Sequence, residues 1–132
     1  MSLRYLVDAD WLIDAAIGRP AAVRTLERLS SDGLSVSIIL AEVYEGAFST
    51  SDPEATLTEF REFLGDYAHL PLTDPIIERF ARLRAALRRQ GQLIPDMDLL
   101  IAATALEAEL TLVTRNVRHF ERIAGLKLYQ PS

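Results

Sequence analysis

Three short apolar runs alternate with helical segments along this chain, and an acidic or amide residue follows each run. The runs span residues 4–7, 34–40 and 110–114, and the residues that follow them are Asp8, Glu42 and Asn116. Strands that alternate with helices pair in parallel, because a parallel connection needs a long crossover that is usually helical. The pattern therefore predicts an α/β fold, a three-layer α/β/α sandwich with a mainly parallel sheet of four to five strands.

Hydrophobic periodicity places helices between and after these strands. We expect helices over residues 11–17, over 20–33, from residue 42, after residue 53, over 76–87 and over 99–106, with further short strands at 69–72 and 126–128. Residues 99–106 are apolar on nearly every side, which indicates a helix in the centre of the molecule. With 132 residues and 49% hydrophobic content, residues 1–132 are expected to form a single domain around one core.

Composition excludes several classes of protein. The 14 basic and 19 acidic residues give a net charge of −5, so any contact with nucleic acid must be local. The absence of cysteine excludes disulfides, thiolate metal sites and thiol catalysis. No apolar run approaches the roughly 20 residues of a membrane span, so we expect a soluble, cytoplasmic protein with no membrane partner. Lys127 is the only lysine, so arginine, which suits bidentate phosphate contacts, supplies nearly all the positive charge.

Five polar residues are predicted to meet at one edge of the sheet. Asp8, Glu42 and Asn116 follow predicted strands, and Asp96 and Asp98 begin the buried helix. Ligands of open α/β sheets bind outside the carboxyl ends of the strands. Taken singly, each of these residues is more commonly a helix cap, but several carboxylates that share a site repel one another and recruit a cation. A site without cysteine favours a hard cation such as Mg²⁺ or Mn²⁺.

Four motifs carry a resemblance to a known family. They are LVDADWLID at residues 6–14, AEVYEG at 41–46, PDMDLLIAATA at 95–105 and LVTRNVRHF at 112–120. Together they resemble the PIN-domain ribonucleases, and within that family they are most similar to the VapC toxins of prokaryotic toxin–antitoxin pairs. The similarity extends over essentially the whole chain, in the same order and spacing, and the last two motifs are the most specific.

The resemblance implies Mg²⁺- or Mn²⁺-dependent cleavage of RNA by a metal-activated water. Residue by residue, it assigns three acidic metal-site positions, which are also catalytic, to Asp8, Glu42 and Asp98. Asn116 matches the fourth polar catalytic position. Thr114 matches a hydroxyl beside the site that is expected to help bind substrate, and Asp96 matches an additional acid that reaches the metal directly or through water.

Two positions in the first motif depart from the family pattern. Ala9 replaces the usual Thr or Ser, and Asp10 stands where Asn is common. We interpret Asp10 as another acid at the start of a helix, where an N-cap acceptor is favoured.

Arginine residues are the candidate contacts to RNA. Arg115 and Arg118 flank Asn116, so we expect them to bind phosphate at the rim of the acidic site. The arginines of the long helix are equally consistent with a solvated face; these are Arg79, Arg82, Arg84, Arg88 and Arg89. His119 is expected to be structural or exposed rather than a general acid.

The resemblance also implies partners. VapC-like proteins form homodimers and are neutralised by a cognate VapB-like antitoxin, in heterotetramers or larger assemblies, and the antitoxin's C-terminal segment covers a groove beside the site. Two predicted helices are unusually apolar, which indicates either core or an interface. Their apolar residues are Trp11, Leu12, Ile13, Ala15, Ala16 and Ile17 on the first, and Val43, Tyr44, Ala47 and Phe48 on the helix from residue 42.

Two other functions remain open from the sequence. A haloacid-dehalogenase-like phosphotransferase would use Asp8 as its nucleophile, since Asp8-Ala9-Asp10 imitates the DxD start of that family. A catalytically silent PIN-like binding module would retain the fold without cleavage. A cleavage assay on mixed RNA with Mn²⁺, Mg²⁺ and chelator separates the three functions.

Overall fold

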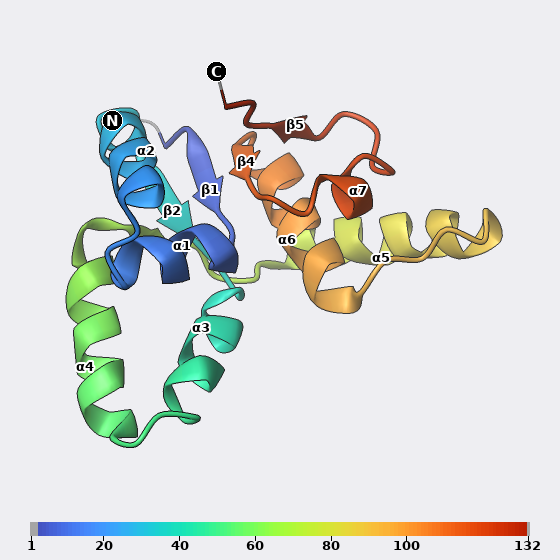
Figure 1. Ribbon diagram of the computed structural model, residues 1–132. Coiled ribbons are helices and arrows are strands. Elements are labelled where there is room, and N and C mark those ends of the chain that lie inside the picture. The colour runs from blue at the N-terminus through green and yellow to red at the C-terminus, as the bar shows by residue number, and fades with distance from the viewer. Residues whose placement is uncertain (1–2, 132) are drawn as a thin grey trace.

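A computed structural model describes residues 3–131, and its centre is a parallel sheet of five strands (Figure 1). The strand order is β3-β2-β1-β4-β5, and every neighbouring pair is parallel. The strands are β1 Tyr5–Val7, β2 Leu34–Val36, β3 Ala68–His69, β4 Thr111–Val113 and β5 Lys127–Leu128. The predicted α/β fold with a parallel sheet is confirmed.

Helices cover both faces of the sheet. They are α1 Ala9–Ala16, α2 Pro20–Ser30, α3 Leu40–Ala47, α4 Pro53–Phe63, α5 Asp74–Arg89, α6 Asp96–Glu107 and α7 Val117–Phe120, with a 3₁₀ turn η1 Leu64–Asp66. Strands β2 and β3 are added on one side of β1, and strands β4 and β5 are then added on its other side. Because such crossovers are right-handed, α1 to α4 lie on one face and α5 to α7 on the other, as Figure 1 shows.

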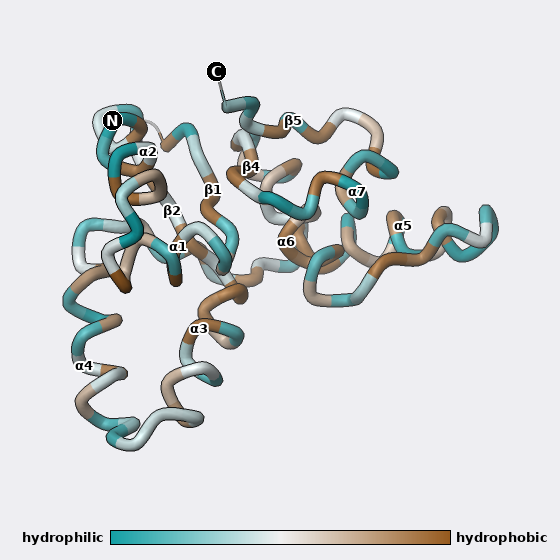
Figure 2. Tube along the Cα trace, in the orientation of Figure 1, coloured by the Kyte–Doolittle hydropathy of each residue, from teal (hydrophilic) through white to brown (hydrophobic). Residues whose placement is uncertain are grey.

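Helix α6 is the central helix that the apolar run predicts. Leu99, Ile101 and Ala102 are fully buried, and the brown segments in Figure 2 mark the same region as hydrophobic. Small side chains such as Ala102 and Ala105 allow close packing, and α6 packs along α5. Helix α6 also contacts β4, which holds this helix, with Asp98 in its first turn, beside the sheet.

Several predicted boundaries are wrong, for local reasons. The strand expected over residues 34–40 ends at Val36, and residues 37–40 form a turn in which the Leu40 N–H donates to the Ser37 carbonyl. Periodicity alone does not distinguish a buried strand from an apolar turn or helix start. The strand expected over 69–72 lies at Ala68–His69, because Pro71 has no N–H for the ladder. Gly18 follows α1 at a φ of +84°, a left-handed conformation that glycine adopts readily at the end of a helix.

The apolar residues of α1 and α3 divide between core and surface. Trp11, Leu12 and Val43 are buried, whereas Ile17 is 61% exposed and Phe48 is 63% exposed. Phe48 follows α3 in the helical hairpin of α3 and α4, which extends away from the sheet in Figure 1. In the described part of the chain, no helix has the length and apolar character needed to cross a membrane.

Candidate active site

The acidic motifs meet between β1 and β4, where the direction in which successive strands are added to the sheet reverses. Strands β1 and β4 are neighbours, but the helices that follow them lie on opposite faces, which opens a crevice at their carboxyl ends. Val7 pairs with Val113, so the next residues, Asp8 and Thr114, lie side by side. The register of β1 with β2 brings Ser37 to the same level on the other side of Asp8.

Asp8 is buried in this crevice, with a residue exposure of 8%. Its Oδ1 accepts a hydrogen bond from the Ala9 N–H at 2.9 Å, and its Oδ2 accepts one from the Thr114 hydroxyl at 2.6 Å. The Asn116 N–H in turn donates to Thr114 Oγ1 at 3.0 Å. Asp8 is therefore both the N-cap of α1 and a residue of the site. Thr114 connects Asp8 to the loop that follows β4.

Burial and like charge both act on Asp8. Burial is the largest cause that raises the pKa of Asp8, the hydrogen bonds from Thr114 and Ala9 oppose it, and the charges of Asp98 and Asp10 raise it further. Glu42, in the first turn of α3, also has a raised pKa, through partial desolvation and then through the charges of Asp8, Asp98 and Asp10. The three predicted metal-site acids are thus close enough to repel one another.

Asp98 is held by a second small cluster. Its Oδ2 lies 3.2 Å from Asn116 Nδ2 and 2.8 Å from His119 Nδ1. The side chain of Asp98 is 15% exposed and that of His119 is 34% exposed. The sequence interpretation of His119 as structural or exposed missed this contact, and the signal available was its position three residues after Asn116, one turn along a helix.

Two further residues of the site were not predicted from sequence. Asp10 does not cap α1, since Asp8 does; it lies in the first turn, and its charge raises the pKa of both Asp8 and Glu42. Ser37 is 5% exposed, and its hydroxyl has no hydrogen-bond partner within residues 3–131. Only the strand register reveals Ser37, because nothing in its local sequence marks it.

Three predicted residues lie at the rim of the site. Asp96 accepts a hydrogen bond from Arg84 Nε at 2.9 Å, its side chain is 64% exposed, and it is not among the charges that raise the pKa of Asp8 or Glu42. Arg115 pairs with Asp14, and its guanidinium lies 4.6 Å from the centroid of the Trp11 ring. Arg118 is exposed and forms no ion pair within the described residues.

A divalent cation fits the chemistry of this cluster. Carboxylate oxygens are hard donors, and a cation would relieve the repulsion that contributes to the raised pKa values of Asp8 and Glu42. Among residues 3–131, no three acidic or histidine side chains approach closely enough to enclose an ion as they stand. Mg²⁺ keeps several waters in protein sites, so few direct contacts are needed, and the exposed Glu42 can change rotamer without repacking the core.

A cluster of acids at the switch point of a small parallel sheet defines a class of α/β proteins that bind their ligands at the carboxyl ends of the strands. Comparison with known proteins identifies the family. The sequence matches the family described as PIN domain over residues 5–126. The chain therefore belongs to the PIN domain family, and its relatives are VapC ribonucleases.

Curated relatives match over nearly their whole length. Ribonuclease VapC2 of Haemophilus influenzae is 32% identical over 126 residues, covering 95% of this chain and 96% of the relative. Ribonuclease VapC1 of Methanocaldococcus jannaschii is 35% identical, and the match covers 96% of this chain and 87% of the relative. The tRNA(fMet)-specific endonuclease VapC of Shigella flexneri is 30% identical, and the match covers 95% of this chain and 96% of the relative.

Solved structures match in fold as well. VapBC2 from Rickettsia felis, bound to a DNA fragment from the promoter, contains a chain that superposes with a TM-score of 0.89 at 26% identity, covering 98% of this chain and 100% of that one. A chain of DNA-bound VapBC from Salmonella typhimurium superposes with a TM-score of 0.87 at 28% identity. The match covers 96% of this chain and 97% of that one. The predicted resemblance to PIN-domain, VapC-like proteins is confirmed.

Proposed function

We propose that this chain is a Mg²⁺- or Mn²⁺-dependent endoribonuclease and the toxin of a toxin–antitoxin pair. The observation that carries the proposal is the buried Asp8, whose pKa is raised in part by Asp98, in the crevice between β1 and β4. A carboxylate placed beside a like charge in a desolvated crevice is costly unless a cation joins it. Relatives named as ribonucleases make RNA the substrate class of choice.

Asp8, Glu42 and Asp98 would hold the ion. When bound, a divalent cation supplies an activated water and neutralises the charge that develops on a phosphate under attack. Asp96 is engaged by Arg84, so we assign it at most a contact through water. Asn116 belongs to the catalytic set because its side chain contacts Asp98 and its backbone N–H contacts Thr114.

The chain's own residues prepare this site before substrate arrives. The Thr114 hydroxyl fixes the Oδ2 of Asp8, and the Ala9 N–H fixes Oδ1, so the carboxylate cannot rotate freely. Held groups of this kind lower the cost of reaching the reactive geometry. We therefore assign Thr114 to orientation of Asp8 at the site, with any contact to substrate made from that position.

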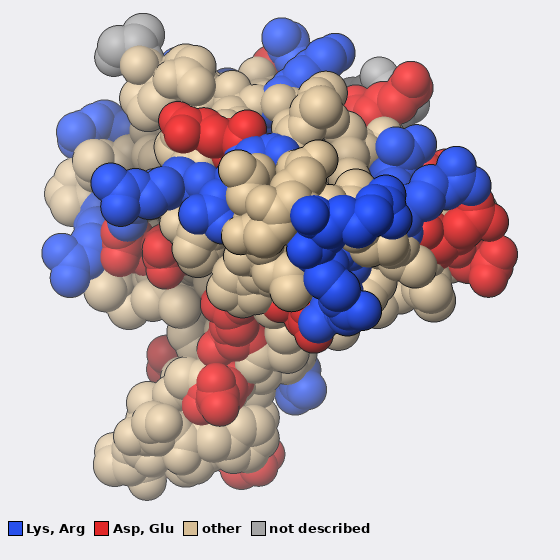
Figure 3. All heavy atoms as spheres, turned by 90° about the vertical axis from the view of Figure 1, so that its right-hand side faces the viewer, with Lys and Arg blue, Asp and Glu red and all other residues tan. Residues whose placement is uncertain are grey.

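Arginines beside the site would hold the RNA strand. A band of basic side chains crosses the face that carries the outer end of α5, with acidic side chains at its edge (Figure 3). On α5, Arg79, Arg82 and Arg84 are engaged by Glu107, Glu78 and Asp96. Arg118, Arg88 and Arg89 form no ion pair in the described part of the chain, so we propose them as phosphate contacts.

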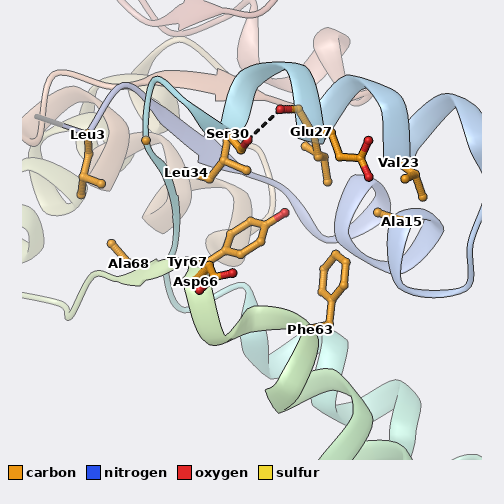
Figure 4. A pocket seen from close by; sticks show the side chains of 12 residues that line it. Leu3, Ala15, Val23, Glu27, Ser30, Leu34, Phe63, Asp66, Tyr67 and Ala68 are labelled. Atoms are coloured by element: carbon orange, nitrogen blue, oxygen red, sulfur yellow. Dashed lines mark hydrogen bonds between the residues drawn. The ribbon is translucent and has the colours of Figure 1, made fainter. Parts of the chain in front are cut away.

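An apolar cavity suits the antitoxin. It has a volume of about 410 Å³ and lies between α2 and the end of α4, where Phe63 and Tyr67 face Val23 and Glu27 in Figure 4. Burial raises the pKa of Tyr67 to about 12, so this ring stays neutral at physiological pH. We propose that an apolar segment of a VapB-like antitoxin fills the cavity, with basic residues near Glu27. Copurification with the product of the neighbouring reading frame tests this partner.

Asp98→Asn tests the proposed activity. The variant keeps the size of the side chain but removes the charge that acts on Asp8 and Glu42. We expect Mn²⁺ affinity and RNA cleavage to fall by more than about 100-fold, the upper end of the cost of losing only an outer-shell partner. The control is Asp32→Asn, an exposed acid paired with Arg4 at the amino end of β1, which should leave both unchanged.

The same experiment separates the alternatives. Wild-type rates of cutting in Asp98→Asn would overturn the site assignment. Release of phosphate from a monoester without RNA cleavage would favour the haloacid-dehalogenase-like reaction, although both oxygens of Asp8 already accept hydrogen bonds. RNA binding without cleavage in any metal would identify a silent binding module.

A further inference from the structure

His119 contacts the site through Asp98, and none of the roles assigned above uses it. Its Nδ1 lies 2.8 Å from Asp98 Oδ2 and 2.8 Å from Asn116 Nδ2, while Asn116 Nδ2 lies 3.2 Å from the same Asp98 oxygen. The three side chains come from α6, from the N-cap of α7 and from α7 itself. Two elements that follow different strands therefore meet on one carboxylate oxygen.

One tautomer of His119 turns its contact with Asp98 into a hydrogen bond. An ionised carboxylate only accepts hydrogen bonds, so the contact between His119 and Asp98 is a hydrogen bond when Nδ1 carries the proton. Nδ1 then cannot accept from Asn116, so the 2.8 Å contact between these two nitrogens is not a hydrogen bond, and the amide of Asn116 donates to Asp98. Both donors converge on Oδ2, and neither contacts Oδ1.

We propose that His119 is a positioning residue which, together with Asn116, holds Oδ2 of Asp98 and so presents Oδ1 to the divalent cation. The proposal rests on the proposed metal-dependent function and adds a residue to it. Groups that hydrogen-bond a metal ligand fix its orientation and typically change metal affinity by about 10- to 100-fold. His119 is suited to this task because its side chain is largely shielded, at 34% exposure, and because α7 packs against α6.

Two variants distinguish the hydrogen bond from the bulk of the ring. His119→Asn carries an amide nitrogen near the position of Nδ1, whereas His119→Gln carries it near the position of Nε2, one bond farther from the backbone. If Nδ1 holds Asp98, Asn should restore the contact and Gln should not. His119→Leu removes every donor, and His69→Asn replaces the other histidine, whose Nε2 lies 3.5 Å from the Leu64 carbonyl.

The experiment measures Mn²⁺ dissociation constants of the full chain by electron paramagnetic resonance, together with kcat and KM for RNA at saturating Mn²⁺. We expect His119→Leu and His119→Gln to weaken Mn²⁺ binding by about 10-fold or more, and His119→Asn and His69→Asn to remain within about threefold of wild type. At saturating Mn²⁺, kcat should fall in the Leu variant while KM stays unchanged, because Asp98 is misaligned but the RNA surface is intact.

Three results overturn the proposal. The first is wild-type Mn²⁺ affinity in His119→Leu. The second is equal loss in His119→Asn and His119→Leu, which would make the imidazole itself a metal ligand. The third is equal affinity in the Asn and Gln variants, a comparison that holds even if His119→Leu fails to fold, since both retain a polar side chain.

Asp98→Asn, measured in parallel, separates this proposal from the function on which it rests. If Asp98→Asn binds Mn²⁺ as wild type does, the metal site itself is wrong. If Asp98→Asn loses binding and the His119 variants do not, the metal site is right and the positioning role of His119 is wrong.

Discussion

Two layers of the candidate site contain similar residues in different physical states. The site floor consists of Asp8, Thr114, Asp98 and Asn116, and the site rim consists of Asp14, Asp96, Arg84, Arg115 and Arg118. On the floor, Asp8 accepts a hydrogen bond from the Thr114 hydroxyl, and Asp98 accepts one from the Asn116 amide. On the rim, carboxylates are paired with arginines, as Asp96 is with Arg84 and Asp14 is with Arg115.

This difference decides what a carboxylate can do. A rim acid is already paired with an arginine, and partly exposed ion pairs of this kind contribute about 0 to 1 kcal/mol to stability. Asp8, by contrast, accepts hydrogen bonds only from the Ala9 N–H and the Thr114 hydroxyl, and burial is the largest cause that raises its pKa. Sequence reasoning grouped Asp96 with Asp98, but the two acids belong to different layers.

The largest effect is expected from Asp8→Asn on the floor. The substitution removes a proposed metal ligand but keeps an oxygen that can accept from the Ala9 N–H. We expect RNA cleavage to fall by more than about 100-fold, beyond the usual loss from an outer-shell change. Without metal, the variant should nevertheless unfold at a higher urea concentration than wild type at pH 7, since a desolvated charge is gone.

The stability gain of Asp8→Asn should depend on pH with a defined sign. The pKa of Asp8 is raised above its ordinary 3.8, so the unfolded chain releases this proton at a lower pH than the folded chain. The contribution of Asp8 to wild-type stability therefore decreases as pH rises from about 4 through the raised pKa, and then levels off. Urea unfolding between pH 4 and pH 7.5 measures this, and a pH-independent difference between variant and wild type would contradict it.

An intermediate effect is expected from Thr114→Val, which has nearly the same shape. The change leaves Asp8 Oδ2 and the Asn116 N–H without their buried partner, at a cost of about 1 to 3 kcal/mol in unfolding free energy. Cleavage should fall by about 10- to 100-fold because Asp8 loses its orientation.

Thr104→Val is the matched control for Thr114→Val. Thr104 is also buried, but its hydroxyl donates only to the Leu100 carbonyl within α6. We expect a loss of about 0.5 to 1.5 kcal/mol in stability and an unchanged cleavage rate. Equal activity in the two variants would show that the hydroxyl of Thr114 serves stability alone.

The smallest effects are expected from the arginines at the edge of the site. Arg118→Ala should reduce the slope of log binding constant against log salt by about 0.7 for single-stranded RNA, because one phosphate contact is lost. Arg115→Ala should change the slope less and lower stability by less than about 1 kcal/mol, since Asp14 and Trp11 already engage its guanidinium.

Salt titration of RNA binding by both arginine variants, with an inactive Asp98→Asn background, measures the two slopes. A larger slope change in Arg115→Ala than in Arg118→Ala would mean that RNA displaces Asp14 from Arg115. The predicted difference between a paired and an unpaired arginine would then be wrong.

Much of the fold follows from local pattern. The alternation of apolar runs and helices predicts the parallel sheet, and the all-round apolar run predicts the buried α6, because periodicity and burial are properties of neighbouring residues. Boundaries were less well predicted, as at residues 37–40, where a turn and a strand have the same apolar composition. The motifs also identified Asp8, Glu42, Asp98 and Asn116 as candidates from residue type and position alone.

The layers within the site depend on tertiary structure. Whether an acid is buried beside Thr114, as Asp8 is, or paired across helices, as Asp96 is with Arg84, depends on contacts between residues 12 or more positions apart. The same holds for Ser37, which reaches the level of Asp8 only through strand register, and for His119, which meets Asp98 only when α7 packs on α6. The sequence determined which residues are candidates for the chemistry, and the packing of distant segments decided which of them share a desolvated space.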